Sequence, residues 1–361
     1  MQSSRWCCHV VLYAAVSLFA IGAAVCQPAR PGQGQVEVRG RQLFRDGQRW
    51  IPHGFYQIAF EVAPGDFGRA DHPFWATAYR NYRPQEYVAM RAAGADSVRM
   101  QIAQAGADPQ SPLFDREFLE KALGAIRAAR AAGLTVIVSV QDESHVPGAQ
   151  PIDLPDAGTR RVWTELAPQF ADDRGVLFEL FNEPRPQPSP QHWKKWKAAM
   201  AQTLRTVRET GARNVVIADG LGVGQVIDGA PLLDDPQVAY ASHPYALGQF
   251  GQTRQAWDRK FGNFSRRAPV IITEWISGGY FCNADTPQST VQFVQYLQGH
   301  GIGLEMGIWD WAPKGFGSVR QGFPQARFSS YAGLSCKQPF YGSGRVIETW
   351  YTTGVPARSP Q

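Results

Sequence analysis

Residues 176–184 read Val176-Leu-Phe-Glu-Leu-Phe-Asn-Glu-Pro184, an apolar strand that runs directly into a polar end. Its hydrophobic residues are nearly continuous rather than alternating, which indicates a strand buried on both faces of a sheet. Further runs of this kind follow one another along the chain, at 50–55, 97–102, 134–140, 215–218, 239–243, 270–273 and 304–309. Strands of this type are typical of a parallel sheet that helices cover.

Helical patterns separate these strands. Apolar residues recur at helical spacing in 118–129, 193–207 and 291–297, and Gly94 and Gly133 stand just past expected helix ends, where a left-handed cap is favoured. The pattern predicts an α/β protein that folds as a single (β/α)8 TIM barrel, with a small N-terminal hairpin and long loops after the first and eighth strands. The alternative is an open, doubly wound sheet with a second domain. No Pro/Ser-rich linker divides the body of the sequence, which favours the single barrel.

The size and composition of the chain fit this fold. It has 361 residues and a hydrophobic content of 44%, which supplies a large core and excludes a disordered, collagen-like or coiled-coil protein. The net charge of +5 is spread without basic runs, so we expect no nucleic-acid partner. The aromatic content of 12%, with 11 Trp, exceeds what a core requires and points to aromatic residues at a binding surface.

The N-terminal segment is predicted to be a targeting sequence. Its apolar run over 10–25 is shorter than the roughly 20 residues of a membrane-spanning helix, and it ends in small residues. We therefore expect a signal peptide over 1–26, a linker over 27–35 and a catalytic domain over 36–361. The protein would then be secreted or periplasmic, with no integral membrane segment after processing; an uncleaved anchor is the alternative.

Cysteine usage agrees with export. Cys7 and Cys8 lie in the predicted signal peptide, and Cys26 lies at its edge, where lipid anchoring is a further alternative. Cys282 and Cys336 remain in the body, where they form one disulfide, as an oxidising compartment allows, or stay as two free thiols.

Polar side chains follow several strands, at the end where α/β barrels carry their active sites. Glu183 ends the fourth strand and Glu274 the seventh, and in a closed barrel these two ends face each other across the mouth. Two carboxyl groups across a cleft are what glycoside hydrolysis requires, because one protonates the leaving oxygen and the other attacks the anomeric carbon. We predict a separation of about 5–5.5 Å, as in enzymes that retain the anomeric configuration.

The run that ends in Asn182-Glu183-Pro184 resembles the Asn-Glu-Pro signature of glycoside hydrolase family 5, the cellulase-like family of retaining (β/α)8 enzymes. The likeness covers almost the whole body, from the hairpin at Val36 to Trp311. It implies a retaining hydrolase that cleaves β-glycosidic bonds by double displacement, with an endo-β-1,4-glucanase as the first expectation. A β-mannanase, or another β-glycan or β-glycoside hydrolase, is the alternative. We expect a polysaccharide or oligosaccharide substrate, no cofactor or metal, and a monomer.

The resemblance assigns roles to individual residues. Glu183 matches the general acid/base and Glu274 the nucleophile. Asn182 matches the residue that binds the sugar 2-hydroxyl, and Arg99 matches the one that keeps the nucleophile ionised. We expect the acid/base to carry a proton at the working pH.

Other expected site residues bear on substrate binding. His243 and Tyr245 match a His-x-Tyr pattern, in which Tyr contacts the nucleophile and His contacts the substrate or the acid/base. Trp309 matches the Trp beneath the sugar under attack, and with Trp275 and Trp311 it accounts for part of the Trp excess as a sugar-stacking surface. Gln141 stands where the family usually has a His, so the substrate specificity need not be that of a usual cellulase.

Two other classes of function compete with a glycosidase. An inactive carbohydrate-binding barrel is one, and the intact pair Glu183/Glu274 argues against it. A metal-dependent barrel hydrolase is the other, but it needs His clusters at strand ends, and the 7 His of this chain are scattered. The glycine-rich run at 220–224 resembles a dinucleotide-binding loop, yet its third glycine comes one residue too early, so we expect only a flexible loop after the fifth strand.

Overall fold

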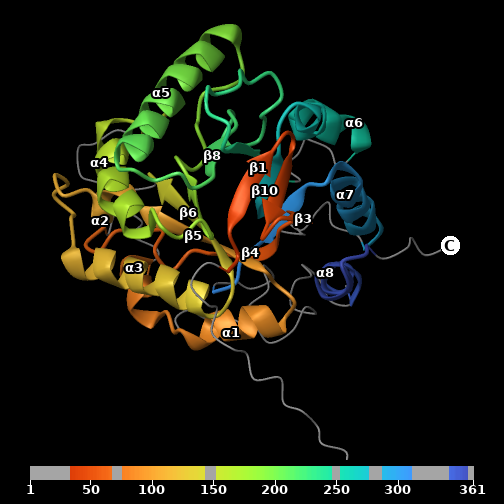
Figure 1. Ribbon diagram of the computed structural model, residues 1–361, viewed down its shortest axis with the longest axis horizontal. Helices are drawn as coiled ribbons and strands as arrows, with labels where there is room; N and C mark the ends of the chain where they lie inside the picture. Colours follow the sequence, from red (N-terminus) through yellow and green to blue (C-terminus); the bar gives the residue numbers. More distant parts are fainter. Residues whose placement is uncertain are drawn as a thin grey trace, which may run out of the picture.

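A computed structural model of the chain describes residues 33–66, 75–142, 152–245, 253–275, 287–310 and 341–356. Eight parallel strands form a closed barrel in the order β10-β11-β4-β5-β6-β7-β8-β9, and helices surround it (Figure 1). The predicted (β/α)8 barrel is therefore confirmed, and the open sheet is excluded.

The barrel strands follow the predicted runs closely. They are β4 (His53–Gln57), β5 (Ser97–Ala103), β6 (Thr135–Gln141), β7 (Val176–Glu179), β8 (Val216–Asp219), β9 (Val238–Ala241), β10 (Val270–Trp275) and β11 (Gly303–Met306). The first run, predicted over 50–55, is divided in the structure: Trp50 ends a separate strand and β4 begins at His53. Pro52 lies between them and has no N–H to donate to a sheet.

The helices alternate with the strands. They are α1 (Gln85–Ala92), α2 (Gln104–Ala107), α3 (Arg116–Ala131), α4 (Ala157–Leu166), α5 (Pro190–Glu209), α6 (Arg254–Trp257), α7 (Pro287–His300) and α8 (Tyr341–Thr353), with short helical turns at η1 (Trp75–Asn81), η2 (Ala167–Phe170), η4 (Asp258–Gly262) and η5 (Phe264–Arg266). The expected helices at α3, α5 and α7 are confirmed, and Gly94 and Gly133 follow α1 and α3 with φ of 91° and 84°. Helix α8 was not predicted. Among the described residues, no helix is both long and apolar enough to cross a membrane.

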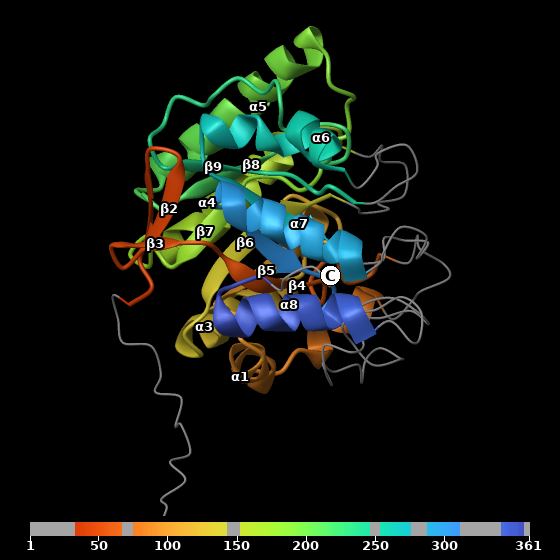
Figure 2. The same ribbon diagram turned by 90° about the vertical axis from the view of Figure 1, so that its right-hand side faces the viewer.

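A small antiparallel sheet lies across one end of the barrel (Figure 2). Its strands are β1 (Val36–Arg39), β2 (Gln42–Arg45) and β3 (Gln48–Trp50), so the predicted hairpin gains a third strand. The Val36 N–H donates to the carbonyl of Arg174, and the Trp50 indole donates to Asp96; both acceptors precede barrel strands. Because this sheet covers the N-terminal ends of the strands, it leaves the carboxyl ends for a functional site.

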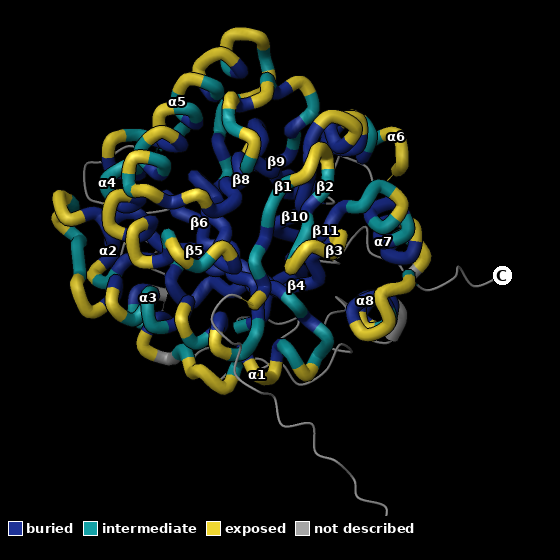
Figure 3. Tube along the Cα trace, in the orientation of Figure 1, coloured by how far each residue is buried: buried dark blue, intermediate teal, exposed yellow. Residues whose placement is uncertain are grey.

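The inside of the barrel changes in polarity along its axis. Every barrel strand is buried along its whole length (Figure 3). Near the N-terminal sheet the apolar side chains form one cluster that includes Ile137, Leu177 and Ile271. Two residues further along β7 and β10, the corresponding positions carry Glu179 and Thr273, which are also fully buried. Since side chains alternate along a strand, these polar groups point inward as well.

Glu305 is a separate buried acid in β11. It is fully buried and accepts a hydrogen bond of 2.5 Å from the Ser97 hydroxyl. A Cβ at Gly54 would lie 1.9 Å from Glu305 Oε2, so the neighbouring strand must carry glycine here. Burial raises the pKa of Glu305 well above its usual range, and the side chain is therefore a neutral acid in the folded protein.

The protonation of Glu305 makes stability depend on pH. Because the folded-state pKa is raised, its contribution is complete below the unfolded pKa and is lost as the pH rises through the folded pKa. We expect Glu305→Gln to remove this decline, since the amide is neutral at every pH. Urea unfolding at several pH values between about 5 and 9 measures the effect. Parallel pH curves for the variant and the wild type would contradict the assignment.

Candidate active site

Glu183 and Glu274 meet at the carboxyl ends of the barrel strands. Glu274 lies in β10, and Glu183 follows β7. One oxygen of each carboxyl group and one ring nitrogen of His243 all lie within 4.8 Å of one another. The Glu183 side chain is 17% exposed and that of Glu274 is 8% exposed, so the pair is accessible but largely desolvated.

Arg99 of β5 links the residues on three strands. Its Nη1 donates to Glu274 Oε2 at 2.8 Å, and its Nε and Nη2 donate to the two oxygens of Glu179 at 2.6 and 2.9 Å. Nη2 also donates to Asn182 Oδ1 at 2.6 Å. The guanidinium is fully buried, and a buried charge is tolerated only when it is paired and hydrogen-bonded, which these contacts achieve.

Glu274 receives hydrogen bonds on both oxygens. The Tyr245 hydroxyl donates to Oε1, and Gln101 Nε2 donates to Oε2 at 3.2 Å, beside the Arg99 contact. Burial raises the pKa of Glu274 and the nearby Glu183 acts in the same direction, whereas Arg99 and Tyr245 oppose part of this rise. Arg99 and Gln101 can only donate to Oε2, so the hydrogen bonds match an ionised carboxylate.

Glu183 adopts a left-handed backbone conformation with φ of 53°. For a residue with a Cβ this costs about 1–2 kcal/mol, so other contacts must hold it. Its N–H donates to Asp219 Oδ2 at 3.1 Å, and its Oε1 lies 2.9 Å from His243 Nδ1. Glu183 is therefore fixed through both its backbone and its side chain.

His243 is a neutral partner in this arrangement. Burial lowers its pKa to about 4, so the imidazole carries no charge at ordinary pH. Nδ1 faces Glu183, and Nε2 lies 2.9 Å from the Thr273 hydroxyl, which is 3.2 Å from Glu179 Oε1. A neutral imidazole has one donor and one acceptor nitrogen. Nδ1 can therefore accept a hydrogen bond from a protonated Glu183 carboxyl group, while Nε2 donates to the Thr273 hydroxyl.

The glycine-rich run at 220–224 is a loop after β8, as expected, and it packs against the site. A Cβ at Gly224 would come within 2.8 Å of His243 Nδ1, and a Cβ at Gly220 would lie 2.1 Å from the Val226 carbonyl oxygen. Two backbone hydrogen bonds join Leu221 and Val226. The glycines permit close packing of this loop on His243, which explains the likeness to a dinucleotide-binding sequence.

Gln141 is fully buried, and its amide group is already occupied. Its Oε1 accepts from Gln101 Nε2 at 2.6 Å, and its Nε2 donates to Glu61 Oε1 at 3.0 Å. Gln101 also contacts Glu274, so a line of hydrogen bonds runs from Glu61 to the nucleophile candidate. Gln141 therefore holds another carboxylate rather than facing solvent.

Trp309 is placed differently from our expectation. It is 1% exposed, its ring packs against Phe55 at 4.9 Å, and its indole N–H donates to Glu86 of α1. These contacts lie on the helix-facing side of the sheet, where Trp275 also packs against Phe293 of α7. Sequence order places both tryptophans at strand ends, but it does not say to which side the chain turns there. The sugar-stacking interpretation of Trp309 thus gains no support.

Several predictions concern residues outside the described ranges. They are the signal peptide over 1–26, the Cys282–Cys336 disulfide and the position of Trp311. These stay predictions.

The sequence analysis missed other polar residues at the site. They are Tyr56, Glu61, Gln101, Glu179, Asp219 and Thr273. Glu179 lies within the predicted strand at 176–181 and Asp219 directly follows the one at 215–218, and the sequence assigns neither of them a role. A carboxylate at an inward position of an otherwise apolar strand is the signal that could have found Glu179.

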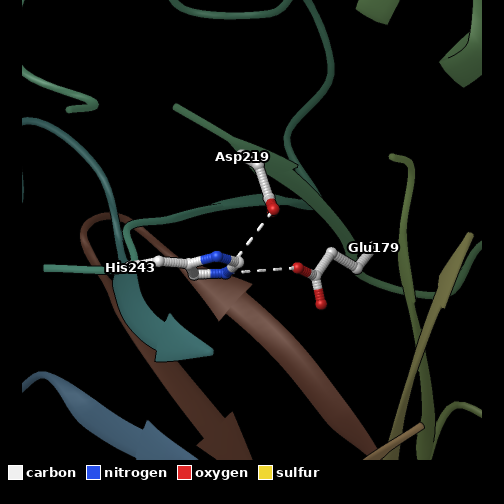
Figure 4. A group of neighbouring side chains, drawn as sticks. All are labelled: Glu179, Asp219 and His243. Carbon is white, nitrogen blue, oxygen red and sulfur yellow. Dashed lines mark ion pairs between the residues drawn. The ribbon is translucent and has the colours of Figure 1, made fainter. Parts of the chain in front are cut away.

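Two groups of three potential metal ligands occur within the described chain: Glu179, Asp219 and His243, and Glu183, His243 and Glu274. Figure 4 shows Glu179 and Asp219 pointing toward the His243 ring. Arg99 already forms a two-point ion pair with Glu179 and a further one with Glu274. The buried positive charge of Arg99 disfavours a cation next to these carboxylates, and we assign no metal to either group.

A known protein family matches the part of the chain that carries this site. Residues 65–315 match the family described as Cellulase (glycosyl hydrolase family 5). The chain belongs to this family. The matched range includes Arg99, Glu183, His243 and Glu274. The resemblance that the Asn-Glu-Pro run suggested is therefore confirmed.

Two curated relatives of the chain are distant in sequence. Endoglucanase A of Ruminococcus albus is 25% identical over 220 residues, which are 50% of this chain and 60% of the relative. Endoglucanase A of Evansella cellulosilytica is 26% identical over 167 residues, which are 45% of this chain and 32% of the relative. The chain thus spans less than two thirds of the length of each.

Solved structures share the fold. The catalytic domain of an endoglucanase from Thermobifida fusca has a TM-score of 0.64 at 19% identity, over 89% of this chain and 98% of that one. A β-glucanase from Saccharophagus degradans in complex with cellotetraose has a TM-score of 0.65 at 16% identity, over 88% and 94%. At such identities the likeness establishes the barrel architecture.

The contact between Gln141 and Glu61 can be tested with a double-mutant cycle. We expect Gln141→Ala and Glu61→Ala to be non-additive by about 0.5–3 kcal/mol, because each variant removes the same hydrogen bond. The cycle is measured both as free energy of unfolding in urea and as kcat/KM. As a control, Arg208→Ala combined with Glu61→Ala should be additive within about 0.5 kcal/mol, since Arg208 pairs with Asp235 instead. Additivity of the first pair would contradict the contact.

Proposed function

We propose that the protein is a retaining β-glycosidase in which Glu274 is the nucleophile and Glu183 the general acid/base. The observation that carries this proposal is the approach of the two carboxyl groups, with oxygens within 4.8 Å. Retaining enzymes hold their carboxyl groups about 5–5.5 Å apart, whereas inverting enzymes need about 6.5–9.5 Å to admit a water molecule. The short distance favours direct attack by a carboxylate.

In the first step Glu274 attacks the anomeric carbon while Glu183 transfers its proton to the leaving oxygen. The C–O bond to the leaving group breaks as the bond to Glu274 forms, which gives a covalent glycosyl-enzyme. Arg99, Gln101 and Tyr245 hold Glu274 in place for this attack. The negative charge on Glu274 also favours a proton on Glu183 beforehand, because two adjacent carboxylates disfavour each other's ionisation.

In the second step Glu183 acts as a base. Once Glu274 is esterified its negative charge is gone, so Glu183 gives up its proton more readily. The Glu183 carboxylate then takes a proton from water, whose oxygen displaces Glu274 from the anomeric carbon. Two displacements at the same carbon return the product in the β configuration.

Asn182 is the residue that we assign to the sugar 2-hydroxyl. Arg99 binds its Oδ1, which fixes the amide beside Glu274 and leaves the amide nitrogen as the donor to the sugar. Hydrogen bonds to the 2-hydroxyl that strengthen in the transition state stabilise it by several kcal/mol. A rigid amide is suited to this because little reorganisation is needed when the charge develops.

We infer that the substrate is a β-1,4-glucan and that cleavage is internal. The names of the relatives, two endoglucanases, and the cellotetraose bound by the β-glucanase support this choice. A second candidate, a β-mannan or another β-glycan, is favoured by one observation: Gln141 binds Glu61, so the group in the family His position is no longer available to a sugar.

We further propose that the chain is exported through residues 1–26 and acts as a monomer.

The two roles can be separated with azide. On the unsubstituted phenyl β-cellobioside, whose leaving group needs a proton, we expect Glu274→Gly to lower kcat/KM by at least about 10⁴-fold and Glu183→Ala by about 10²–10⁴-fold. Azide should restore turnover of Glu274→Gly with an α-glycosyl azide as product, because it takes the place of the nucleophile. With Glu183→Ala it should give a β-glycosyl azide, because it replaces water in the second step. NMR of the products measures the configuration.

The outcome also separates the competing classes of function. Full activity in both variants would refute the assignment, and activity lost on treatment of the wild type with a chelator would indicate a metal-dependent enzyme. A wild type that binds cello-oligosaccharides and cleaves none of them would be a carbohydrate-binding barrel.

A panel of polysaccharides decides the substrate. We expect the wild type to cleave carboxymethyl-cellulose and mixed-linkage β-glucan into oligosaccharides, with a rapid fall in viscosity as the sign of internal cleavage. Chromatography of the products gives their length. A preference for mannan would favour the second candidate, and release of single sugars alone would contradict internal cleavage.

A further inference from the structure

Asp219 is a buried acid that the two catalytic steps do not use. It ends β8, it is fully buried, and its side chain faces His243 and Glu179 inside the barrel (Figure 4). Its Oδ2 accepts the backbone N–H of Glu183 at 3.1 Å and lies 3.6 Å from His243 Nε2. An acid from a different strand thus touches the backbone of the acid/base candidate.

The other oxygen of Asp219 indicates which group carries a proton. Oδ1 meets no donor among the residues that the structure describes, although it is fully buried. A carboxylate oxygen of Glu179 lies within 4.8 Å of one of Asp219, and the two side chains are hydrogen-bonded. Glu179 is already bound through both oxygens to Arg99. A buried oxygen without a donor is satisfied if it bears a proton itself and donates to the Glu179 carboxylate.

The electrostatics agree with this placement. Burial raises the pKa of Asp219 well above its usual range, and the charge of Glu179 adds to the rise. Burial also acts on Glu179, but the Arg99 guanidinium opposes it and holds the pKa of Glu179 below its usual value. One guanidinium therefore keeps Glu179 ionised and leaves Asp219 neutral.

We propose that Asp219 is a positioning residue for the general acid: as a neutral carboxylic acid it donates to Glu179 and accepts the Glu183 N–H, and it thereby holds Glu183 in its left-handed conformation. This inference rests on the proposed acid/base role of Glu183. A neutral Asp219 can make both hydrogen bonds at once, whereas an ionised one could not donate to Glu179 and would add a negative charge next to His243.

The expected effect is confined to proton donation. Without Asp219 the Glu183 backbone loses the acceptor of its N–H and is free to leave the left-handed region, which moves the carboxyl away from the leaving oxygen. Glu274 keeps its contacts with Arg99, Gln101 and Tyr245, because none of them involves Asp219. The attack on the anomeric carbon should therefore persist.

Two substrates distinguish a misplaced acid from a damaged enzyme. The dinitrophenolate of 2,4-dinitrophenyl β-cellobioside departs without protonation. The phenolate of the unsubstituted phenyl β-cellobioside needs a proton from the general acid to depart. In the full chain we expect Asp219→Ala to lower kcat/KM on the phenyl substrate by about 10²-fold and on the dinitrophenyl substrate by no more than about 5-fold. Asp219→Asn should keep both rates within about 3-fold of the wild type, because its amide can also donate to Glu179 and accept the Glu183 N–H.

Asp310 offers a matched control. It is a half-buried acid, four residues past the end of β11, that accepts the backbone N–H groups of Ile58 and Ala59, and it lies outside the Glu183 contacts. Asp310→Ala should change the rates on the two substrates by the same factor. Thermal melting of each variant shows whether it folds.

The results separate this inference from the proposed function. Equal losses on both substrates in Asp219→Ala would overturn the positioning role. Loss of activity in a folded Asp219→Asn would overturn the neutral state of Asp219, and this variant decides the question if Asp219→Ala does not fold. A wild type that cleaves neither aryl substrate would instead contradict the proposed glycosidase function.

Discussion

The site depends on one buried guanidinium. Arg99 is enclosed by Glu179, Glu274 and Asn182, which come from two other strand ends, and it supplies the positive charge that these carboxylates share. A buried charge of this kind is stable only while its partners remain, so the contacts fix the strand ends relative to one another. They also decide where protons reside. Arg99 holds the pKa of Glu179 below its usual value, whereas burial, together with the charge of Glu179, raises the pKa of Asp219.

The barrel register brings the partners of Arg99 to the same inner region of the barrel. Arg99 of β5 is paired with Ile137 of β6, and Ser139, two residues along β6, is paired with Glu179 of β7. Inward positions on successive strands therefore form one polar layer directly above the apolar layer that the N-terminal sheet covers. A slip of one residue in any strand would turn its polar side chain toward the helices, since alternate residues face opposite sides. The same burial that stabilises the fold thus specifies the site.

The fold and the central pair were predictable because they rest on local signals. Continuous apolar runs indicate strands, and the polar residues that end them indicate the active face, so Glu183 and Glu274 could be placed without a structure. Asp219 could not, because its partner is the backbone of Glu183, 36 positions away, in a conformation that no sequence pattern encodes. Trp309 shows the opposite failure. Its position at a strand end was read correctly, but the direction of its ring depends on packing against Phe55 and Glu86.

The remaining polar groups are arranged so that few of them titrate. His243 is neutral because burial lowers its pKa to about 4, and Asp219 is neutral because burial raises its pKa. Gln141, at the position where the resemblance leads us to expect a His, joins Gln101 to Glu61 through one donor and one acceptor, and its amide cannot gain a proton. A histidine could make the same two contacts, but beside Glu61 it could also become charged. Proton transfer during the proposed reaction is therefore left to Glu183, and the charges of Glu183 and Glu274 alone change between the two displacement steps.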